Sequence, residues 1–487
     1  MNNPLFTKTK VICTIGPASE TYEKIKALAE AGMNICRLNF SHGTYEEHKA
    51  RIELIRKVSE ESGINLAVAL DTKGPEIRLG DFENDEEVYE IGETVTLCKE
   101  EILGTHERFS IRCPELFDDM EKDNYILIND GKMKLTVLDN NGEEMKCRVD
   151  VAGPISSHKG CNVPGVKLSM PFLSKKDEED IRFGCRNDID FIFASFVRRA
   201  SDVLAIKKIL IEEGKPRINI IAKIENQEGF DNVVSIIDAA DGVMVARGDL
   251  GVEIPTTMVP IYQKSIIREA NILGKPVITA THMLDSMTHN PRCTRAEAAD
   301  VCNAVLDGSD GVMLSAESAA GDYPVEACET LASIAKEAEK ILPYRSRLDW
   351  LRSTGEKTVQ DAVSIAISDA TLSLDNIGAI VVFTQGGTTA RRISKFRPKV
   401  PIIAITFTKD TQRKLESYWG VFPIFSEVQN NMTNDDDLAS LYAKEYGLKK
   451  GELIIISAGY PTGEGSANMM KIVEDKYGSM SHFLLEK

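Results

Sequence analysis

One pattern repeats eight times along this sequence: a short run of β-branched and other apolar residues ends in polar or glycine residues, and an amphipathic helical stretch follows. The runs are VICTIG, NICRLNF, LAVALDT, FIFASFV, NIIAKIE, GVMVARG, VITATHM and GVMLSAE. Short apolar runs of this kind are typical of buried strands. Eight such strands with helices between them predict an α/β fold in the form of a (β/α)₈ TIM barrel.

Two further segments do not belong to the barrel pattern. Roughly from Gly74 to Pro171, short alternating segments such as ETVTLCK, YILIND and KLTVLD predict a small β domain inserted in a barrel loop. After about Leu342 the alternation returns with GAIVVFT, PIIAITF and ELIIISAG, which predicts a separate α/β domain, and the DWLRSTGEK stretch looks like part of the connection. The expected domains are a discontinuous barrel of residues 1–73 and 172–343, an inserted β-barrel lid of residues 74–171 and a C-terminal α/β domain of residues 344–487.

Composition excludes several classes of function. The 487 residues exceed one ordinary core and suggest about three domains. Asp and Glu number 75 against 58 Lys and Arg, and the net charge of −17 argues against a nucleic-acid or anionic-membrane partner. With no run approaching the ~20 apolar residues of a membrane span and no signal peptide, we expect a cytoplasmic protein. The ten scattered cysteines are expected to be reduced packing thiols.

Polar residues at the strand ends indicate where the functional site lies. In a barrel of this kind, side chains at the C-terminal ends of the strands and in the following loops line one mouth. We therefore expect these polar residues to converge on a single site. They are Thr14, Arg37, Asn39, Ser41, Asp71, Thr72, Ser195, Lys223, Glu225, Asp249, Thr281 and Ser315.

Lys223, Glu225 and Asp249 suggest the chemistry of that site. Alternate residues of a strand share a face, so Lys223 and Glu225 point the same way. Taken alone, this pair fits a salt bridge closing a barrel end as well as it fits catalysis. With Asp249 on the next strand, two carboxylates and an amine suit a divalent cation that bridges an anion. Because no thiolate or imidazole cluster accompanies them, Mg²⁺ or Mn²⁺ is favoured over zinc.

Two neighbouring features have weaker interpretations. Asn39, Ser41, Asp71 and Thr72 offer only oxygen ligands, which suit a second, hard cation, although spacing alone favours local hydrogen bonding in the loops. The RGDLG segment, residues 247–251, precedes a helix expected to begin near Pro255. Its glycines would let backbone N–H groups approach a carboxylate or phosphate, but an ordinary strand-to-helix turn explains them equally well.

Longer motifs carry a resemblance to a known family. They are TIGPAS (14–19), RLNFSHG (37–43), LDTKGPEIR (70–78), KIENQEG (223–229), ARGDLGVEIP (246–255) and TRAEAADV (294–301). In this order they closely resemble the pyruvate kinase family. HKGCNVPG in the inserted segment and TQGGTTAR in the last domain extend the resemblance across nearly the whole chain.

The resemblance implies transfer of the phosphoryl group of phosphoenolpyruvate to ADP, giving pyruvate and ATP in the last step of glycolysis. Positions similar to the family's substrate contacts are Arg37, Ser195, Lys223, Gly248, Asp249 and Thr281. Lys223 matches the lysine that neutralises the transferring phosphoryl group, and Arg37 matches the arginine that also holds it. Thr281 resembles the threonine near the carbon that is protonated. The proton would reach this carbon through water or with help from Ser315.

The resemblance also implies two cations and a nucleotide site. Glu225 and Asp249 match the Mg²⁺ or Mn²⁺ ligands, and Glu76 is typical of potassium-dependent members. The positions that match the K⁺ site are Asn39, Ser41, Asp71 and Thr72. His42, Arg78 and Lys159 fall at positions similar to the family's ADP contacts. Because Lys159 belongs to the inserted segment, we expect that domain to close over the mouth as a lid that excludes water.

Three residues depart from the family pattern. His282 stands where glutamine is usual, and on an alternating strand end it should point away from Thr281, so an altered packing contact is expected rather than a new acid. Cys293 replaces a usual proline and Ala316 a usual glycine, and both are expected to adjust loop stiffness only.

The last domain carries a candidate effector loop. Residues Thr384, Gly386, Gly387, Thr388 and Thr389 belong to a segment that follows a strand and opens a helix, a plausible phosphate cradle. It looks like the family's sugar-phosphate loop, but Glu464 in the facing segment would repel a second phosphate. Fructose 1,6-bisphosphate, a monophosphate, a nucleotide or no effector all remain open. By resemblance alone, a homotetramer is expected.

Two other functions fit part of the pattern. A metal-dependent aldolase or lyase acting on pyruvate enolate would also use Glu225, Asp249 and a barrel, but it leaves Lys159 and the lid unexplained. A catalytically silent effector-binding protein is the second alternative. The presence of Lys223, Arg37 and both metal-ligand candidates argues against it.

Overall fold

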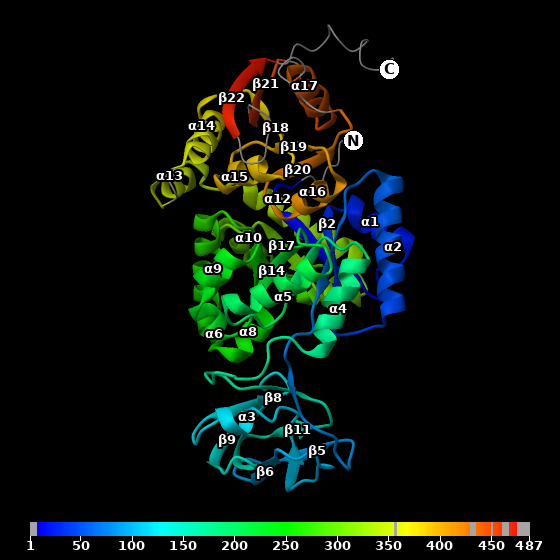
Figure 1. The fold of residues 1–487 in the computed structure, drawn as a ribbon, viewed down its shortest axis with the longest axis vertical. Helices are drawn as coiled ribbons and strands as arrows, with labels where there is room; N and C mark the ends of the chain where they lie inside the picture. The colour runs from blue at the N-terminus through cyan, green and yellow to red at the C-terminus, as the bar shows by residue number, and fades with distance from the viewer. Residues whose placement is uncertain (1–6, 355–357, 429–434, 450, 460–466, 475–487) are drawn as a thin grey trace.

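The computed structural model describes residues 7–354, 358–428, 435–449, 451–459 and 467–474. Three bodies lie one after another along the long axis of the molecule (Figure 1). The barrel is in the middle, the inserted β domain lies at one end and the C-terminal domain at the other. Within the described ranges, no helix has the length and apolar character needed to span a membrane.

Eight parallel strands close the central barrel in the order β1-β17-β16-β15-β14-β13-β3-β2. Their bounds are β1 Lys10–Thr14, β2 Met33–Asn39, β3 Ala67–Asp71, β13 Phe191–Ala194, β14 Asn219–Ile224, β15 Gly242–Ala246, β16 Val277–Ala280 and β17 Gly311–Leu314. Each of the eight apolar runs in the sequence contributes one strand, so the predicted TIM barrel is confirmed.

The barrel interior is filled by side chains. Buried residues that point inward include Ile12, Ile35, Phe193, Met244 and Met313. A second apolar cluster lies between the strands and the surrounding helices. Because the interior is packed, a ligand can reach the barrel only at its ends.

Helices cover the outside of the barrel. The longer ones are α1 Tyr22–Glu30, α2 Tyr45–Ser62, α4 Lys175–Arg186, α5 Ala200–Glu212, α7 Val233–Ala239, α9 Val259–Leu273, α10 Arg295–Asp307 and α12 Pro324–Lys340. Short helical elements follow the strands at the mouth: α6 Gln227–Asp231, α8 Arg247–Glu253, η1 Thr256–Met258, η2 Asp285–Thr288 and α11 Ala316–Ala319. Reciprocal capping boxes begin α2 at Thr44 and α10 at Thr294, and left-handed Gly63 and Gly308 end these two helices.

The inserted segment forms a curled β domain. Its seven-stranded sheet has the order β4-β12-β8-β9-β10-β6-β7, and β11 pairs with β5. The bounds are β4 Ile77–Arg78, β5 Glu87–Tyr89, β6 Thr94–Cys98, β7 Arg108–Ser110, α3 Leu116–Asp119, β8 Tyr125–Ile128, β9 Met133–Asn140, β10 Glu144–Val151, β11 Gly153–Ile155 and β12 Gly160–Asn162. An antiparallel bridge between Leu79 and Ile111 joins the two ends of the sheet, which gives the small barrel that the sequence predicts.

The C-terminal domain is built on one sheet with the order β20-β19-β18-β21-β22. Its elements are α13 Tyr344–Thr354, α14 Val359–Ser373, β18 Ile377–Phe383, α15 Thr388–Lys395, β19 Ile402–Thr406, α16 Lys409–Lys414, η3 Leu415–Ser417, β20 Val421–Phe425, α17 Asp435–Glu445, β21 Leu453–Gly459 and β22 Ala467–Glu474. The DWLRST part of the expected connection belongs to helix α13, whose Leu348 and Leu351 pack with Phe396. The connection is therefore a packed element and not an open linker.

A buried ion pair attaches the C-terminal domain to the barrel. Lys10 Nζ lies 3.1 Å from Glu416 Oε2, and the two residues are 0% and 4% exposed. The Glu416 carboxylate also accepts hydrogen bonds from Asn34 at 3.0 Å and Asn65 at 2.8 Å. Lys10 begins the first barrel strand, so this cluster anchors η3 to the end of the barrel opposite the mouth.

We expect Lys10→Met to destabilise the attachment of the C-terminal domain. The apolar stem is kept, but Glu416 loses its buried cation, and removing one partner of a buried pair costs about 3 kcal/mol or more. The check is urea unfolding of the first transition, compared with Lys26→Met. Lys26 lies 3.9 Å from Glu30 on an exposed helix face, where such pairs contribute roughly 0.5 kcal/mol. Equal losses in the two variants would contradict the anchoring role.

Candidate active site

Lys223 is the centre of a buried polar network at the barrel mouth. Its Nζ lies 3.0 Å from Asp71 Oδ1, 2.8 Å from Ser195 Oγ and 3.1 Å from Glu225 Oε1. Strand β14 ends at Ile224, so Lys223 and Glu225 flank the strand end. Asp71 ends β3 and Ser195 follows β13, which means that three strands place these groups together. The convergence expected from the strand ends is present for these residues.

Arg37 joins the network through the other oxygen of Asp71. Arg37 Nε lies 2.6 Å from Asp71 Oδ2, and Arg37 Nη1 donates to Thr14 Oγ1 at 3.0 Å. Burial alone would raise the pKa of Asp71, but Arg37 and Lys223 outweigh it and hold the pKa below its usual value. Burial would lower the pKa of Lys223, but Asp71 and Glu225 raise it above its usual value. The site therefore keeps two cations and one bridging carboxylate charged near neutral pH.

Glu225 has an environment that suits a bound cation. Burial raises the pKa of Glu225 to about 7, Lys223 opposes this, and Asp249 adds to it. Oε2 accepts the Phe196 N–H at 2.5 Å. Oε1 lies 3.1 Å from Lys223 Nζ but accepts no hydrogen bond from any residue that the structure describes. An under-coordinated carboxylate oxygen that is repelled by a second carboxylate fits the donor set of a divalent cation.

The metal-ligand candidates are few. Among the described residues, no group of three or more His, Cys, Asp and Glu side chains is arranged to hold a metal ion. Glu225 and Asp249 are therefore a pair of carboxylates and not a complete protein cage. Such partial ligation is usual for Mg²⁺, which keeps waters and takes further oxygens from a phosphate substrate.

Asp249 and Gly248 lie inside a helix, contrary to the prediction. Helix α8 begins at Arg247, while the helix expected near Pro255 begins only at Val259 after the 3₁₀ turn η1. The Gly248 N–H is not free for an anion in this structure, because it donates to Thr281 Oγ1 at 2.7 Å. The bond instead links α8 to the end of the next strand.

Thr281 occupies a strained turn. Strand β16 ends at Ala280, one residue earlier than expected, and Thr281 and His282 have φ values of 69° and 53°. The argument that His282 points away because strand residues alternate is therefore wrong. His282 is exposed in the turn. A β-branched residue in the left-handed region costs about 1–3 kcal/mol, which surrounding contacts must offset.

Arg247 supplies part of that compensation. Its Nη2 donates to the Thr281 carbonyl at 2.7 Å, and its Nη1 lies 2.7 Å from Asp300 Oδ2 on helix α10. The Thr281 hydroxyl itself also donates to the Ala280 carbonyl at 2.7 Å. The threonine side chain is thus held in one orientation beside Gly248.

The potassium-site candidates make local hydrogen bonds. Ser41 N–H donates to Asn39 Oδ1 at 3.1 Å, and Thr72 Oγ1 accepts the Ser195 N–H at 3.1 Å. Asp71 is shared with the Lys223 network, so this oxygen-rich group lies next to it.

Ser315 and His42 are not joined to the Lys223 network by a hydrogen bond between described residues. Ser315 precedes helix α11, and its Oγ is buried with no partner within the described ranges. His42 has an exposed side chain, and its carbonyl lies 2.9 Å from His48 Nε2. Cys293 is partly buried just before the α10 cap, and Ala316 begins α11.

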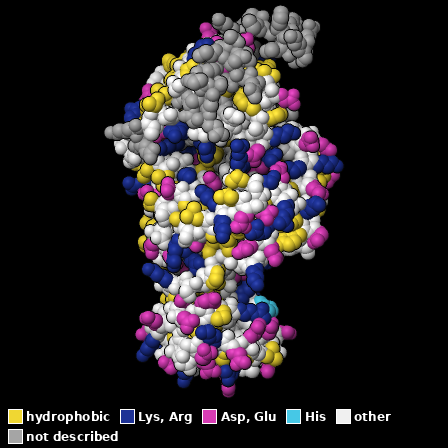
Figure 2. Space-filling view, in the orientation of Figure 1, with side chains coloured by type: hydrophobic (Ala, Val, Ile, Leu, Met, Phe, Trp, Pro, Cys, Tyr) yellow, Lys and Arg dark blue, Asp and Glu magenta, His cyan; other side chains and the backbone are white. Residues whose placement is uncertain are grey.

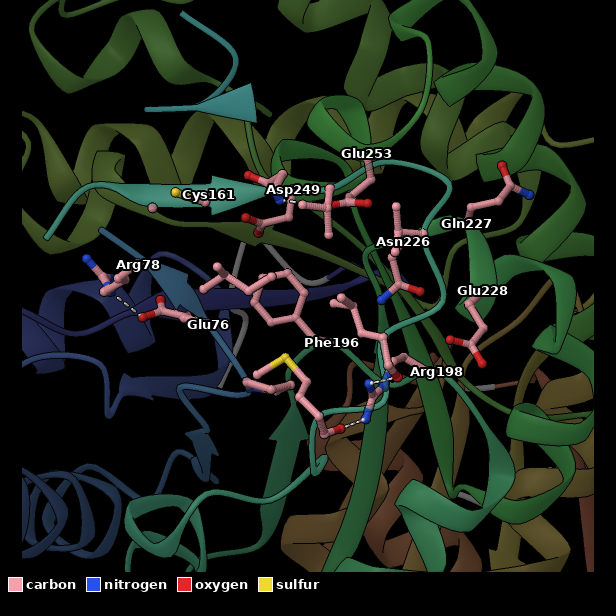
Figure 3. Close-up of a pocket in the computed structure, with 18 of the residues that line it drawn as sticks. Glu76, Arg78, Cys161, Phe196, Arg198, Asn226, Gln227, Glu228, Asp249 and Glu253 are labelled. Atoms are coloured by element: carbon pink, nitrogen blue, oxygen red, sulfur yellow. Dashed lines mark hydrogen bonds and ion pairs between the residues drawn. The ribbon is translucent and has the colours of Figure 1, made fainter. Parts of the chain in front are cut away.

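A cleft of about 580 Å³ separates the inserted domain from the barrel mouth. Arg78 and Lys159 line it from the inserted domain, and Asp249 lines it from the barrel. Figure 3 shows Arg78 with Glu76 on the side opposite Asp249 and Glu253. Arg78 Nε lies 2.7 Å from Glu76 Oε2, which also lies 3.1 Å from Lys73.

Several residues of the cleft were not anticipated. Phe196 has a φ of 55° and projects into the middle of the view in Figure 3, while its N–H holds Glu225. Arg198 donates to the Leu168 and Met170 carbonyls in the returning linker. No sequence signal marks a left-handed phenylalanine, because Phe has no preference for that conformation.

The candidate effector loop does open a helix. Gly387 has a φ of 83° and precedes α15, as the glycine-rich motif suggests. Arg391 donates to Thr388 Oγ1 at 3.1 Å, and Thr411 Oγ1 donates to the Gln385 carbonyl at 3.0 Å. Glu464, expected to face this loop, lies outside the described residues.

Comparison with known proteins agrees with the geometry. The family model "Pyruvate kinase, barrel domain" matches residues 6–328, and "Pyruvate kinase, alpha/beta domain" matches residues 361–473. A pyruvate kinase of Staphylococcus haemolyticus (strain JCSC1435) is 49% identical over 471 residues, which cover 96% of this chain and 80% of the relative. A pyruvate kinase of Staphylococcus aureus (strain USA300) is 50% identical over 469 residues, with the same coverage of 96% and 80%. The chain belongs to the pyruvate kinase family.

Proposed function

We propose that the cleft transfers the phosphoryl group of phosphoenolpyruvate to ADP, giving pyruvate and ATP, with Lys223 and Arg37 holding the transferring group. The observation that carries this proposal is the position of Lys223, a buried cation that contacts Asp71, Ser195 and Glu225 at the barrel mouth. Phe196, whose N–H donates to Glu225, connects this network to the wall of the cleft. Family membership makes the chain a phosphotransferase. The contacts of individual residues support the roles proposed for them.

Fixed positive charge is what phosphoryl transfer requires of this site. The negative charge of the moving group spreads over its oxygens, and preorganised cations stabilise it without reorganising. Asp71 holds both Lys223 and Arg37, at 3.0 and 2.6 Å, so their positions are set before substrate arrives. Ser195 donates to the Thr72 carbonyl at 2.6 Å and thereby fixes the hydroxyl that contacts Lys223.

Glu225 and Asp249 would hold Mg²⁺ or Mn²⁺, and Asn39, Ser41, Asp71 and Thr72 would hold K⁺. When bound, the divalent ion would supply positive charge that stabilises the transferring phosphoryl group. The repulsion between the two carboxylates supports the first assignment, as does Glu225 Oε1, which accepts no hydrogen bond from a described residue beyond its ion pair with Lys223. The oxygen-only donors beside Asp71 support the second. Glu76, already paired with two cations, supports potassium dependence only through the family resemblance.

ADP would bind in the cleft between the two domains. Arg78 and Lys159 face Asp249 across it, so the terminal phosphate would approach the metal site from the inserted domain. His42 would contact the nucleotide from the barrel side, although it does not line the cleft in this structure. Closure of the inserted domain as a lid would exclude water that otherwise accepts the phosphoryl group.

Protonation of the enolate completes the reaction. Thr281 is the candidate for this step by family resemblance, and the Gly248 N–H fixes its hydroxyl at 2.7 Å beside α8. The proton would pass through water or with the help of Ser315, whose buried hydroxyl has no hydrogen-bond partner among the described residues.

The direct test is pyruvate formation from phosphoenolpyruvate and ADP, with Mg²⁺ and K⁺ omitted in turn. We expect activity only when both substrates and the divalent cation are present, and a loss of activity when K⁺ is replaced by Na⁺. Pyruvate release without ADP would instead favour the aldolase or lyase function. A protein that is silent in every mixture but binds phosphorylated ligands would be an effector-binding protein.

We expect Lys223→Met to lower turnover by at least roughly 10²-fold, because one preorganised donor to the transition state is removed. The methionine stem preserves most of the packing, so folding measured by circular dichroism should be retained. Lys26→Met, at an exposed helix position, is the matched control. Turnover close to that of the unchanged protein would reject the role assigned to Lys223.

We also propose that Thr384, Gly386, Gly387, Thr388 and Thr389 bind a phosphorylated effector, and that the protein is a cytoplasmic homotetramer. The turn geometry at Gly387 supports the first statement, and family resemblance supports the others. At sub-saturating phosphoenolpyruvate, a sugar monophosphate or a nucleotide monophosphate should raise the rate, and Thr388→Glu should abolish that response. Unchanged rates with fructose 1,6-bisphosphate, monophosphates and nucleotides alike would dispose of the effector site.

A further inference from the structure

One hydrogen bond joins the lid sheet to the barrel. Asn162 Nδ2 on strand β12 donates to Glu253 Oε1 on helix α8 at 2.8 Å. Within the described residues, no other hydrogen bond or ion pair connects a strand of the inserted domain with the barrel. Elsewhere the two bodies meet through the linkers at a narrow waist, which Figure 2 shows between the lower body and the middle one.

Asn162 and Glu253 lie on opposite sides of the cleft, one on the lid and the other on the barrel. On the lid side, β12 pairs with β4, and the Leu79 N–H donates to the Lys159 carbonyl at 3.0 Å. This strand pair bears Arg78 and Lys159. On the barrel side, Glu253 follows Asp249 by one turn of α8, so both carboxylates lie on the same face of the helix. Figure 3 shows Asp249 and Glu253 close together at the cleft wall.

The linkers contribute to this separation. Arg198 holds the returning linker through the carbonyls of Leu168 and Met170, and Asp177 Oδ1 accepts the Gly74 N–H in the outgoing linker at 3.0 Å. Leu168 and Met170 in turn pack against the apolar core of the lid. To these linker contacts the Asn162–Glu253 bond adds the one polar contact that a strand of the lid itself makes with the barrel among the described residues.

We propose that Asn162 and Glu253 hold the lid sheet against helix α8 and thereby set the distance between the nucleotide-binding strand pair and Asp249. Both are positioning residues, and neither is assigned a contact with the reacting atoms. The bond is half-buried, so water competes with it less than with a hydrogen bond at the surface. The expected change in KM for ADP rests on the proposed function, whereas the expected change in hydrogen–deuterium exchange does not.

The kinetic test compares Asn162→Ala, Glu253→Ala, Glu253→Gln and Asn162→Ala/Glu253→Ala. Loss of this hydrogen bond should raise KM for ADP about tenfold with a smaller change in kcat. Glu253→Gln keeps the acceptor oxygen and should stay within about twofold of the unchanged protein. Because one shared contact is lost, the double variant should be no worse than either alanine variant. Asn84→Ala, which removes an exposed Asn–Glu bond of 2.6 Å within the lid, is the matched control.

The mechanical test needs no activity. Hydrogen–deuterium exchange of the substrate-free protein should be faster in residues 72–76 and 164–172 of Asn162→Ala than in Asn84→Ala. Asn162→Asp should accelerate it further, because two carboxylates then face each other.

Unchanged hydrogen–deuterium exchange and an unchanged KM for ADP in Asn162→Ala would overturn the proposal that this bond positions the lid. The proposal would also fail if Glu253→Gln raised KM for ADP as much as Glu253→Ala does, because the charge of Glu253 and not its hydrogen bond would then matter. If the unchanged protein fails to make pyruvate, the proposed function is wrong. The comparison of exchange rates still tests whether the Asn162–Glu253 bond positions the lid.

Discussion

The structure depends on a buried ammonium group that is surrounded by acceptors at the end of a packed barrel. Lys223 retains its charge only because Asp71 and Glu225 outweigh the cost of burial. Lys223 and Glu225 come from the end of β14 and Asp71 from the end of β3, so these strands must lie on the same side of the barrel for the charges to balance. Arg37 enters the same balance through the second oxygen of Asp71. The barrel fold therefore brings these charged groups together, and their charges balance only in that fold.

That network explains why the cleft above it is suited to a phosphate substrate. The chain carries a net charge of −17, so an anion must be attracted by a local arrangement of cations. Lys223 and Arg37 supply two cations at the barrel mouth, and Arg78 and Lys159 line the cleft from the inserted domain. In the proposed function, Glu225 and Asp249 would hold a divalent cation and the inserted domain would control access as a lid. The Asn162–Glu253 bond, the one polar contact between a lid strand and the barrel among the described residues, would then help to position that domain.

Periodicity in the sequence predicts the architecture well because the barrel strands are short, apolar and regularly followed by polar ends. The same logic places Lys223, Asp71 and Ser195 together. It fails at Thr281 and Phe196, whose left-handed backbone opposes their intrinsic preferences and is imposed by tertiary contacts such as those of Arg247. It also cannot find the Asn162–Glu253 bond, because 91 positions separate the partners and nothing in either local motif specifies the other.

The measurement that tests the central claim most directly is anomalous diffraction from crystals grown with Mn²⁺ and a non-reactive phosphoenolpyruvate analogue. The account predicts one Mn²⁺ peak liganded by Glu225 and Asp249, with the phosphoryl oxygens of the analogue within hydrogen-bonding distance of Lys223 and Arg37. A Mn²⁺ peak bound away from both carboxylates, or an analogue that avoids the Lys223 ammonium, would contradict it.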